Sequence, residues 1–356
     1  IPEFPELFQK HAFEVPQKSL DNEKGWQLES QAKRELLEYI RNAGKPLGEY
    51  VDGHFYRGIL TGLNDAFIID GETKDRLLSE DPKSGEIIKP FLRGKDVKRW
   101  RVEPQDYWLI FTRRGINIEA YPAIHRHLMA FQDRLEPKPA NWDDELKWEG
   151  RKAGSYKWFE IQDNIAYWEN FEREKILIPA IQVQPEAARD TVNFYCNNKA
   201  SIFVHDNAIF LAGIVNSSVS SWFARQTFAT KQGGFFDFEP RYSSTFPIPN
   251  AEEHLREAVS SVAKVIEVNR TPRFEQLLNG LVYELFFPEE LHARDIFLFD
   301  ACERAGLGSL SSIEDHLLKE RADAWAGEIF TSSHEIYRML FDLRALDVVR
   351  LIEGEE

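Results

Sequence analysis

The strongest signals in the sequence are YRGILTGLNDAFIID at residues 56–70 and IIKPFLRGKDVKRW at residues 87–100. The glycines of the first stretch allow tight backbone turns, because glycine adopts dihedral angles that other residues avoid. In the second stretch, Pro90 and Gly94 shape a loop that is rich in lysine and arginine. The two stretches therefore predict rigid, glycine-hinged loops, and basic loops of this kind are suited to holding phosphates and reading guanine.

The sequence around these loops alternates short β-rich runs with Gly, Pro, Asn and Asp, which is typical of strands separated by turns. The runs with the clearest strand pattern are residues 66–69, 107–112, 175–181 and 201–204. Residues 208–225 instead predict one helix, with small residues on one side for close packing. We therefore expect a mixed α/β (α+β) domain over residues 46–250.

The two ends of the chain differ from this central part. Residues 1–45 predict a linker and a first helix, which covers residues 30–41. Residues 251–356 predict an acidic, all-helical domain, because apolar residues recur there at helical spacing. Two capping boxes are expected at the starts of its helices, Asn250 with Glu253 and Ser332 with Glu335.

Charge is unevenly distributed along the chain. The 356 residues include 44 Lys and Arg against 59 Asp and Glu, a net charge of −15, which excludes a protein coated all over with basic residues. Residues 83–114 nevertheless hold nine basic residues against four acidic ones, whereas residues 251–356 hold 11 against 22. Phosphate contacts depend on local lysines and arginines, so the basic window is compatible with DNA binding and the acidic end indicates a different partner.

Several classes of protein are excluded by what the sequence lacks. The longest apolar run, residues 208–215, is much shorter than the roughly 18 residues of a membrane helix. Two cysteines are too few for a disulfide framework, so we expect an intracellular, cytoplasmic protein. Glycine motifs for dinucleotides or phosphates, the motif for amino-methyl transfer and zinc-type cysteine pairs are all absent. We expect no catalytic residue, metal or cofactor in this chain, and its start at Ile1 leads us to expect a piece of a longer protein.

Further blocks of sequence accompany the two opening stretches in a fixed order. They are YPAIHRHL at residues 121–128, WFEIQDNIAYWENF at residues 158–171, KILIP at residues 175–179, and the segments 201–224, 241–249 and 281–286. Together the blocks resemble the TaqI-like C-terminal specificity domain, the target recognition domain of type IIG restriction–modification enzymes and adenine-specific DNA methyltransferases. The resemblance covers about residues 30–290, and residues 291–356 match no family pattern.

The resemblance implies that the chain reads a short sequence of double-stranded DNA for a methyltransferase domain located upstream. In such systems the catalytic domain flips an adenine out of the double helix and methylates its amino nitrogen, with S-adenosylmethionine as the cofactor. The site-specific DNA-methyltransferase (adenine-specific) activity, the cofactor and any endonuclease activity would then belong to the parent protein of a bacterial defence system.

Fifteen polar residues on the expected loops are our candidates for DNA contact. They are Arg57, Thr61, Asn64, Lys89, Arg93, Lys95, Lys98, Arg99, Arg113, Arg114, Arg151, Lys152, Lys157, Lys231 and Gln232. An asparagine side chain can bind the edge of adenine, whereas lysines and arginines hold phosphates or read guanine. The tryptophans at positions 100, 108, 158 and 168 lie beside strand-like runs, and we expect them in the core.

The sequence is also compatible with two other functions. The acidic helices, with their apolar stripes, could dock on a partner protein, which would make the α/β part a scaffold. The string DGETK at residues 70–74 contains acids and a lysine of the kind that hold a divalent metal in nucleases. The third hypothesis is therefore a stand-alone metal-dependent nuclease that uses Glu72 and Lys74. Against it, Gly71 favours a simple turn after a strand.

Overall fold

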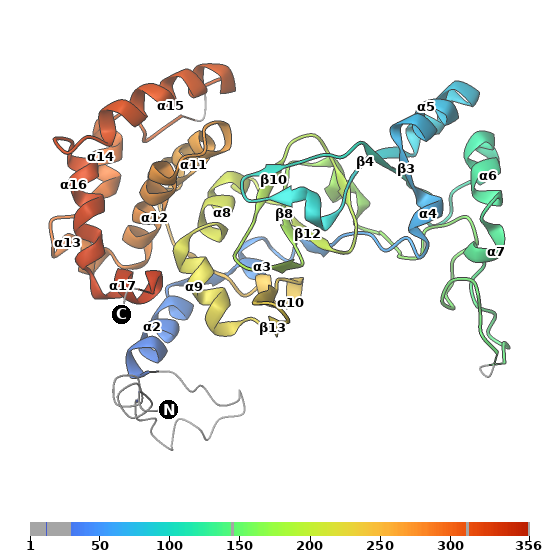
Figure 1. Ribbon diagram of the computed structural model, residues 1–356, viewed down its shortest axis with the longest axis horizontal. Helices are drawn as coiled ribbons and strands as arrows, with labels where there is room; N and C mark the ends of the chain where they lie inside the picture. Colours follow the sequence, from blue (N-terminus) through green and yellow to red (C-terminus); the bar gives the residue numbers. More distant parts are fainter. Residues whose placement is uncertain (1–11, 13–29, 144–145, 311–312, 355–356) are drawn as a thin grey trace, which may run out of the picture.

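The computed structural model describes residues 12, 30–143, 146–310 and 313–354. The molecule is elongated (Figure 1). The C-terminal helices lie at one end, a group of sheets lies in the middle, and a small sheet with its own helices forms the other end, which we call the distal end. The chain enters this arrangement through helix α2 (Gln31–Asn42), which Ser30 caps by accepting a hydrogen bond from the backbone of Lys33.

A four-stranded antiparallel sheet lies in the middle of the molecule. Its strands are ordered β10 (Ala188–Asp190), β8 (Lys175–Pro179), β12 (Ala200–Phe203) and β2 (Phe55–Arg57). Because side chains alternate between the two faces of a strand, Ile176 and Ile178 enter one hydrophobic core whereas Leu177 enters another. The sheet is therefore covered on both faces, and every residue of β8 is buried.

The distal end is built on a second four-stranded sheet. Its order is β11 (Tyr195–Cys196), β4 (Ile88–Leu92), β7 (Tyr107–Ile110) and β3 (Ile68–Asp70), with β11 and β4 parallel and the other pairs antiparallel. The helices of this end are α4 (Asn64–Phe67), α5 (Gly71–Glu80), α6 (Pro122–Met129) and α7 (Gln132–Leu135). Their apolar residues complete the second core.

Short strands and helices join these parts. The pairs are β1 (Gly44–Pro46) with β15 (Pro247–Pro249), and β5 (Val97–Lys98) with β6 (Arg101–Val102), while β9 (Ile181–Gln182), β14 (Phe235–Asp237) and β13 (Thr230–Lys231) form a three-stranded sheet. The single-turn helices α3 (Leu47–Tyr50) and α10 (Pro240–Ser243) lie beside them. A Cβ atom on Gly44 would lie 1.9 Å from the carbonyl oxygen of Ile248, so only glycine allows β1 and β15 to pair here.

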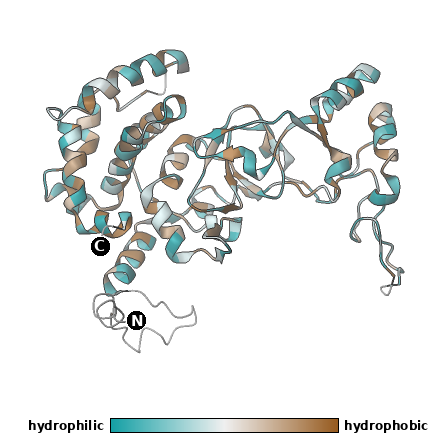
Figure 2. Ribbon diagram, in the orientation of Figure 1, coloured by the Kyte–Doolittle hydropathy of each residue, from teal (hydrophilic) through white to brown (hydrophobic). Residues whose placement is uncertain are grey.

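Helices make up the C-terminal end. They are α8 (Ala208–Val215), α9 (Ser218–Thr227), α11 (Glu253–Val268), α12 (Pro272–Phe286), α13 (Pro288–His292), α14 (Leu298–Arg304), α15 (Asp315–Ile329), α16 (Glu335–Asp342) and α17 (Asp347–Glu353). Hydrophobic and hydrophilic residues are interleaved along them (Figure 2), and their apolar sides share one core with α2 and the central sheet. Helix α8 lies before residue 250 and α11 lies after it, and the two helices pack closely in the same core. The predicted domain boundary at residue 250 therefore stays a prediction.

The predicted fold class is confirmed, because a region of mixed helices and sheets is followed by a helical region over residues 253–353. Within the described ranges, 30–143, 146–310 and 313–354, none of the helices has the length and apolar character that crossing a membrane requires.

Several local predictions are wrong. Residues 64–67 form helix α4, so the strand expected from residue 66 begins only at Ile68. The single helix expected over residues 208–225 breaks at Asn216, whose side chain bonds both backbone groups of Ala187, and Ser217 then caps α9. Neither capping box forms, because Glu252 and His334 occupy the N-cap positions of α11 and α16.

Candidate nucleic-acid interface

A hollow beside strand β9 brings together residues that are far apart in the sequence. It is lined by the 93–98 turn, by residues around β9 and by Asn197, Lys199 and Phe235. We call it the lysine hollow, because Lys95, Lys98 and Lys199 all line it. Among the described residues, none of the three ammonium groups has a hydrogen bond or an ion pair. Their charge is therefore available to an anionic ligand.

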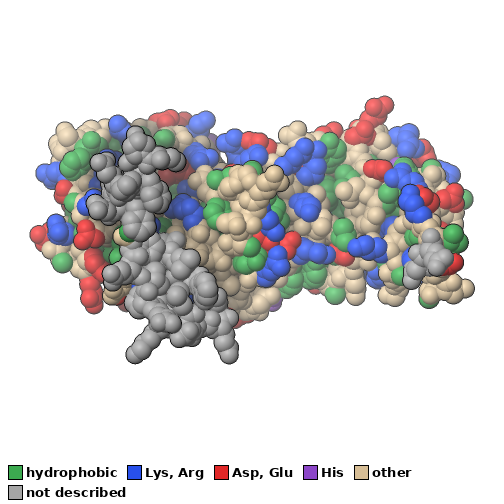
Figure 3. All heavy atoms as spheres, turned by 60° about the horizontal axis from the view of Figure 1, so that its bottom comes forward, with side chains coloured by type: hydrophobic (Ala, Val, Ile, Leu, Met, Phe, Trp, Pro, Cys, Tyr) green, Lys and Arg blue, Asp and Glu red, His purple; other side chains and the backbone are tan. Residues whose placement is uncertain are grey.

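Apolar side chains are exposed beside these lysines. Ile181, Val183 and Phe235 line the lysine hollow and are 45%, 57% and 40% exposed. Cations next to exposed apolar groups match the needs of a DNA-binding surface, since lysine holds phosphates and apolar groups contact the thymine methyl. Figure 3 shows Lys and Arg side chains gathered over the middle of the molecule on one face.

The turn that carries Lys95 and Lys98 is held in a fixed conformation. Arg93 donates two side-chain hydrogen bonds to the buried carboxylate of Asp96, at 2.8 and 2.9 Å, and its guanidinium lies 4.3 Å from the centre of the Tyr107 ring. The hydrogen bond to Asp96 raises the pKa of Arg93 above its usual value. A Cβ atom on Gly94 would lie 2.2 Å from the carbonyl oxygen of Lys199, so only glycine brings these two loops together.

Asn197 ties the same two loops to each other. Its side-chain oxygen accepts hydrogen bonds from the backbone of Gly94, at 3.1 Å, and from the backbone of Lys199, at 3.2 Å. Lys95 and Lys199 therefore stand on loops that are fixed relative to one another, although about 100 residues separate them in the sequence.

A β-hairpin forms another side of the hollow. Strands β13 and β14 are joined by Gln232, Gly233 and Gly234, and both glycines have positive φ, at 81° and 77°. The buried carboxylate of Asp237 anchors the hairpin. It accepts a hydrogen bond from Arg241 at 2.7 Å and forms an ion pair with Lys231 at 3.2 Å. Lys231 and Gln232 are exposed at the end of the hairpin.

Replacement of Asp237 by asparagine should lower the free energy of unfolding by about 1–3 kcal/mol, because a buried charged acceptor is lost. Burial alone raises the pKa of Asp237, but hydrogen bonds from the Glu239 backbone, Arg241 and Lys231 outweigh it and lower the pKa. The stabilisation from Asp237 is therefore present above its unfolded-state pKa and is lost as the pH falls through the lower folded-state pKa.

The measurement is urea unfolding of wild type and Asp237→Asn at neutral pH and at acidic pH. The difference between the two proteins should shrink as the pH falls. Glu239→Gln, at a half-buried neighbouring carboxylate, is the control and should stay within about 0.5 kcal/mol of wild type. A difference that grows on acidification would contradict this account.

A second hollow holds three further candidates, Lys89, Arg113 and Arg114. The ammonium group of Lys89 pairs with Glu172 at 2.7 Å, and Glu172 also accepts from the hydroxyl of Tyr195. Arg114 donates to the backbone carbonyls of Ile161 and Gln162. The exposed Arg113 lies over the Trp168 ring at 4.7 Å, so it is the cation of this hollow that is best placed for an outside ligand.

Three candidates are engaged in contacts inside the protein, and their role in DNA binding stays a prediction. Arg151 is only 4% exposed and donates to five backbone carbonyls, those of Leu135, Thr61, Glu160, Lys157 and Trp158. Burial lowers its pKa to about 10. Thr61 is 1% exposed and donates to Asn64, and the Arg99 side chain, 12% exposed, pairs with Glu275 on the helical side. The structure gives all three residues internal contacts and no open surface towards the lysine hollow.

The remaining candidates lie at the surface. Arg57 pairs with Asp163 at 3.1 Å, and Asn64, Lys152 and Lys157 are exposed on or near the distal end. Their contact with DNA stays a prediction. Sequence reasoning missed Lys199 and the exposed apolar residues of the hollow. The weak signal for Lys199 was its position after two asparagines in a turn between two strands.

The nuclease-like string has structural uses in the described chain. Asp70 caps helix α5 by accepting from the backbone of Thr73 at 2.8 Å, and this hydrogen bond lowers its pKa. Lys74 pairs with Asp75 and lies over the Trp108 ring. A turn was expected at Gly71, but Gly71 is the first residue of helix α5. Nowhere in the described residues do three or more His, Cys, Asp or Glu side chains gather as a metal site.

All residues that line the lysine hollow lie within a segment that matches a known protein family. Residues 89–248 match the family model of the TaqI-like C-terminal specificity domain. This segment is therefore similar to a TaqI-like C-terminal specificity domain. The resemblance expected from the sequence is thereby confirmed over this range, which includes Lys95, Lys98, Lys199 and the hairpin.

Among solved structures, the chain is similar to MmeI, a type IIL restriction–modification enzyme determined in complex with DNA, with 14% sequence identity and a TM-score of 0.44. The similarity covers 84% of this chain and 35% of that one, so the chain spans about a third of the length of this relative. No curated protein matches the chain.

Proposed function

We propose that the chain recognises a short sequence in double-stranded DNA, as the specificity module of a restriction–modification enzyme or an N6-adenine DNA methyltransferase. One observation carries the proposal: three lysines without internal partners among the described residues line one hollow, inside the segment that matches a specificity domain. The fixed 93–98 turn and the hairpin give this hollow the rigidity that recognition requires.

The groups around the hollow divide into two kinds of contact. Lys95, Lys98 and Lys199 hold phosphates and thereby set the position of the protein on the duplex. The hairpin carries an exposed amide at Gln232 and an exposed ring at Phe235, which suit an adenine edge and a thymine methyl in the major groove. A two-stranded ribbon has the dimensions to enter that groove.

In this proposal the chemical step belongs to an upstream part of a longer parent protein. That part would methylate adenine with S-adenosylmethionine, and an endonuclease activity and a type IIG organisation belong to the same proposal, as does a cytoplasmic location. The reading frame upstream of residue 1 is where the base-holding motif, Asn or Asp followed by Pro-Pro and Tyr or Phe, is expected.

The combined replacement Lys95→Ala, Lys98→Ala and Lys199→Ala should weaken binding to duplexes of every sequence. Each phosphate contact contributes about one unit to the slope of log affinity against log salt concentration, so the slope should fall by about three. The measurement is duplex binding by fluorescence anisotropy over a series of salt concentrations.

Matched replacements of three exposed cations at the helical end, Arg294, Lys319 and Arg338, serve as the control and should leave both affinity and slope unchanged. An unchanged slope in the hollow variant, or duplex binding that does not depend on salt in the wild type, would overturn the proposal.

One observation favours a second candidate, a protein-docking function of the helical end. Tyr337 and Phe341 lie one helical turn apart on α16 and are 38% and 65% exposed. This face would fit contact with another domain of the parent protein, and such contact is compatible with DNA recognition by the sheets.

A further inference from the structure

A third charged hollow lies where the sheets meet the C-terminal helices. It is lined by Arg99, by one face of α9, by Arg270 and Glu275 around the start of α12, and by the last residues of α17. We call it the arginine hollow, because Arg99, Arg225 and Arg270 all line it. Lys98 lines the lysine hollow and Arg99 lines this one, so the tight β5–β6 turn carries a cation into each.

Two of the arginines are held by one carboxylate oxygen. Oε1 of Glu275 accepts from Nε of Arg99 at 3.0 Å and from Nε of Arg270 at 3.2 Å. In the described structure, the outer nitrogens of both guanidinium groups have no hydrogen-bond acceptor. Burial lowers the pKa of Arg99, and the positive charge of Arg270 lowers it further, although Glu275 opposes both effects. The two guanidinium groups therefore repel one another, and an anion between their outer nitrogens would relieve this repulsion.

Helix α9 supplies the third arginine and two hydroxyl groups. Arg225 donates to Oγ of Ser221 at 3.0 Å and to the carbonyl of Ile352 at 3.2 Å, and it pairs with no carboxylate among the residues described. A guanidinium group has five N–H donors, so most of them remain for a ligand. Ser217, Ser221 and Arg225 lie at intervals of four residues on one face of the helix, and both serines are buried.

The hydroxyl groups of Ser217 and Ser221 act as acceptors within the described structure. Ser217 Oγ accepts from the backbone of Ser220, and Ser221 Oγ accepts from Arg225. Neither hydroxyl donates its hydrogen to a described acceptor, which leaves both as donors at a site lined by arginines.

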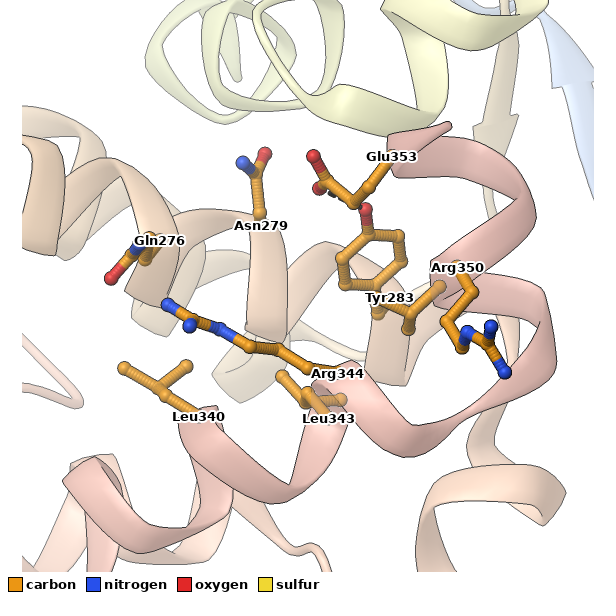
Figure 4. Close-up of a pocket in the computed structure, with 9 residues that line it drawn as sticks. Gln276, Asn279, Tyr283, Leu340, Leu343, Arg344, Arg350 and Glu353 are labelled. Carbon is orange, nitrogen blue, oxygen red and sulfur yellow. Dashed lines mark hydrogen bonds between the residues drawn. The ribbon is translucent and has the colours of Figure 1, made fainter. Parts of the chain in front are cut away.

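The second acid of the hollow is already engaged. The Tyr283 hydroxyl donates to Glu353 at 2.6 Å, and Figure 4 shows these two side chains pointing toward one another in a neighbouring hollow that Glu353 also lines. Glu353 thus forms the wall between the two hollows. The arginine hollow has three guanidinium groups against two carboxylates, and these carboxylates also accept hydrogen bonds from the indole of Trp100 and the hydroxyl of Tyr283.

We propose that the arginine hollow binds a phosphate group. Guanidinium nitrogens and serine hydroxyls are donors whose hydrogen bonds a phosphate group accepts. The same chemistry is found in the DNA backbone and in free phosphate. If the ligand is the DNA backbone, the inference rests on the proposed function, and the arginine hollow would hold phosphates of the same duplex that the lysine hollow binds.

The test uses the complete chain and two readouts. The first is thermal unfolding in phosphate compared with chloride at equal ionic strength, and the second is duplex binding. Phosphate should raise the melting temperature of the wild type, and both Arg225→Gln and Arg270→Gln should remove most of that increase. Arg338→Gln, at an exposed position on α16, is the matched control and should keep it. The variant with three alanines in the lysine hollow should also keep it, which separates this proposal from the previous one.

Duplex binding identifies the source of the phosphate. If Arg225→Gln lowers duplex affinity about tenfold and reduces the salt slope by about one, the DNA backbone is the ligand. If the variant loses only the stabilisation by phosphate, free phosphate is the ligand. The proposal is overturned if phosphate stabilises Arg225→Gln, Arg270→Gln and wild type equally and duplex affinity does not change.

Discussion

Replacement of Lys175 by methionine should lower the free energy of unfolding by about 3–5 kcal/mol. Lys175 and Asp190 face one another on strands β8 and β10, and both side chains are fully buried. The ammonium group lies 2.6 Å from the Asp190 carboxylate and also donates to the carbonyl of Phe171 at 2.7 Å. Methionine fills a similar volume but leaves a buried carboxylate without its counter-charge, and that is the costly half of breaking such a pair.

The measurement is urea unfolding followed by circular dichroism. The double replacement Lys175→Met with Asp190→Leu should recover part of the loss, because no charge then stays buried, although the backbone groups of Val192 and Phe194 lose their acceptor. Ile176→Val, on the same strand, is the packing control and should cost about 0.5–1.5 kcal/mol. A single variant as stable as wild type would show that the pair does not hold the central sheet together.

This ion pair shows which part of the fold the sequence could predict. The run KILIP predicts a buried strand from its apolar residues, and β8 follows it over the expected range up to Pro179. The burial of the lysine at its first position could not be predicted, because it depends on a partner 15 residues away that reaches it only across a sheet. Helix α4 was missed for a different, local reason. The strand-forming residues Phe67, Ile68 and Ile69 outweighed the turn chemistry at Asn64 in the prediction.

The candidate site divides in the same way. The density of basic residues over 83–114 correctly indicated a cationic turn, since local charge is visible in the sequence. Which cations stay available depends on internal partners. Asp96, three residues after Arg93, was within reach of sequence reasoning, whereas Glu275 lies 176 residues from Arg99. Lys199 was missed because a single lysine in a turn gains its meaning only when the fold sets it beside Gly94.

Replacement of Arg151 by methionine should destabilise the distal end by about 3–5 kcal/mol, because its guanidinium donates to five backbone carbonyls. Those of Leu135, Glu160 and Trp158 accept from no other donor among the described residues, whereas those of Thr61 and Lys157 also accept from a backbone N–H. The contacts join the loop at residues 150–158 to Thr61 and to the end of helix α7. Gly62 lies against the same side chain, since a Cβ atom there would be 2.6 Å from Cδ of Arg151. Arg151 therefore organises the loops of the distal end from within.

Arg151→Lys separates this internal role from a contact with DNA. Lysine keeps the charge but offers three donors from a single point, so it cannot reach five carbonyls arranged around a planar fork. We expect faster hydrogen exchange over residues 150–162 and a loss of about 1–3 kcal/mol in unfolding free energy. Duplex affinity, measured where the variant is folded, should be unchanged, and Lys152→Met at the exposed neighbouring position should leave stability within about 0.5 kcal/mol of wild type. If Arg151→Lys weakened duplex binding without loosening the distal loops, Arg151 would be a DNA contact after all, because only a side chain that reaches the duplex can change affinity while the loops around it keep their order.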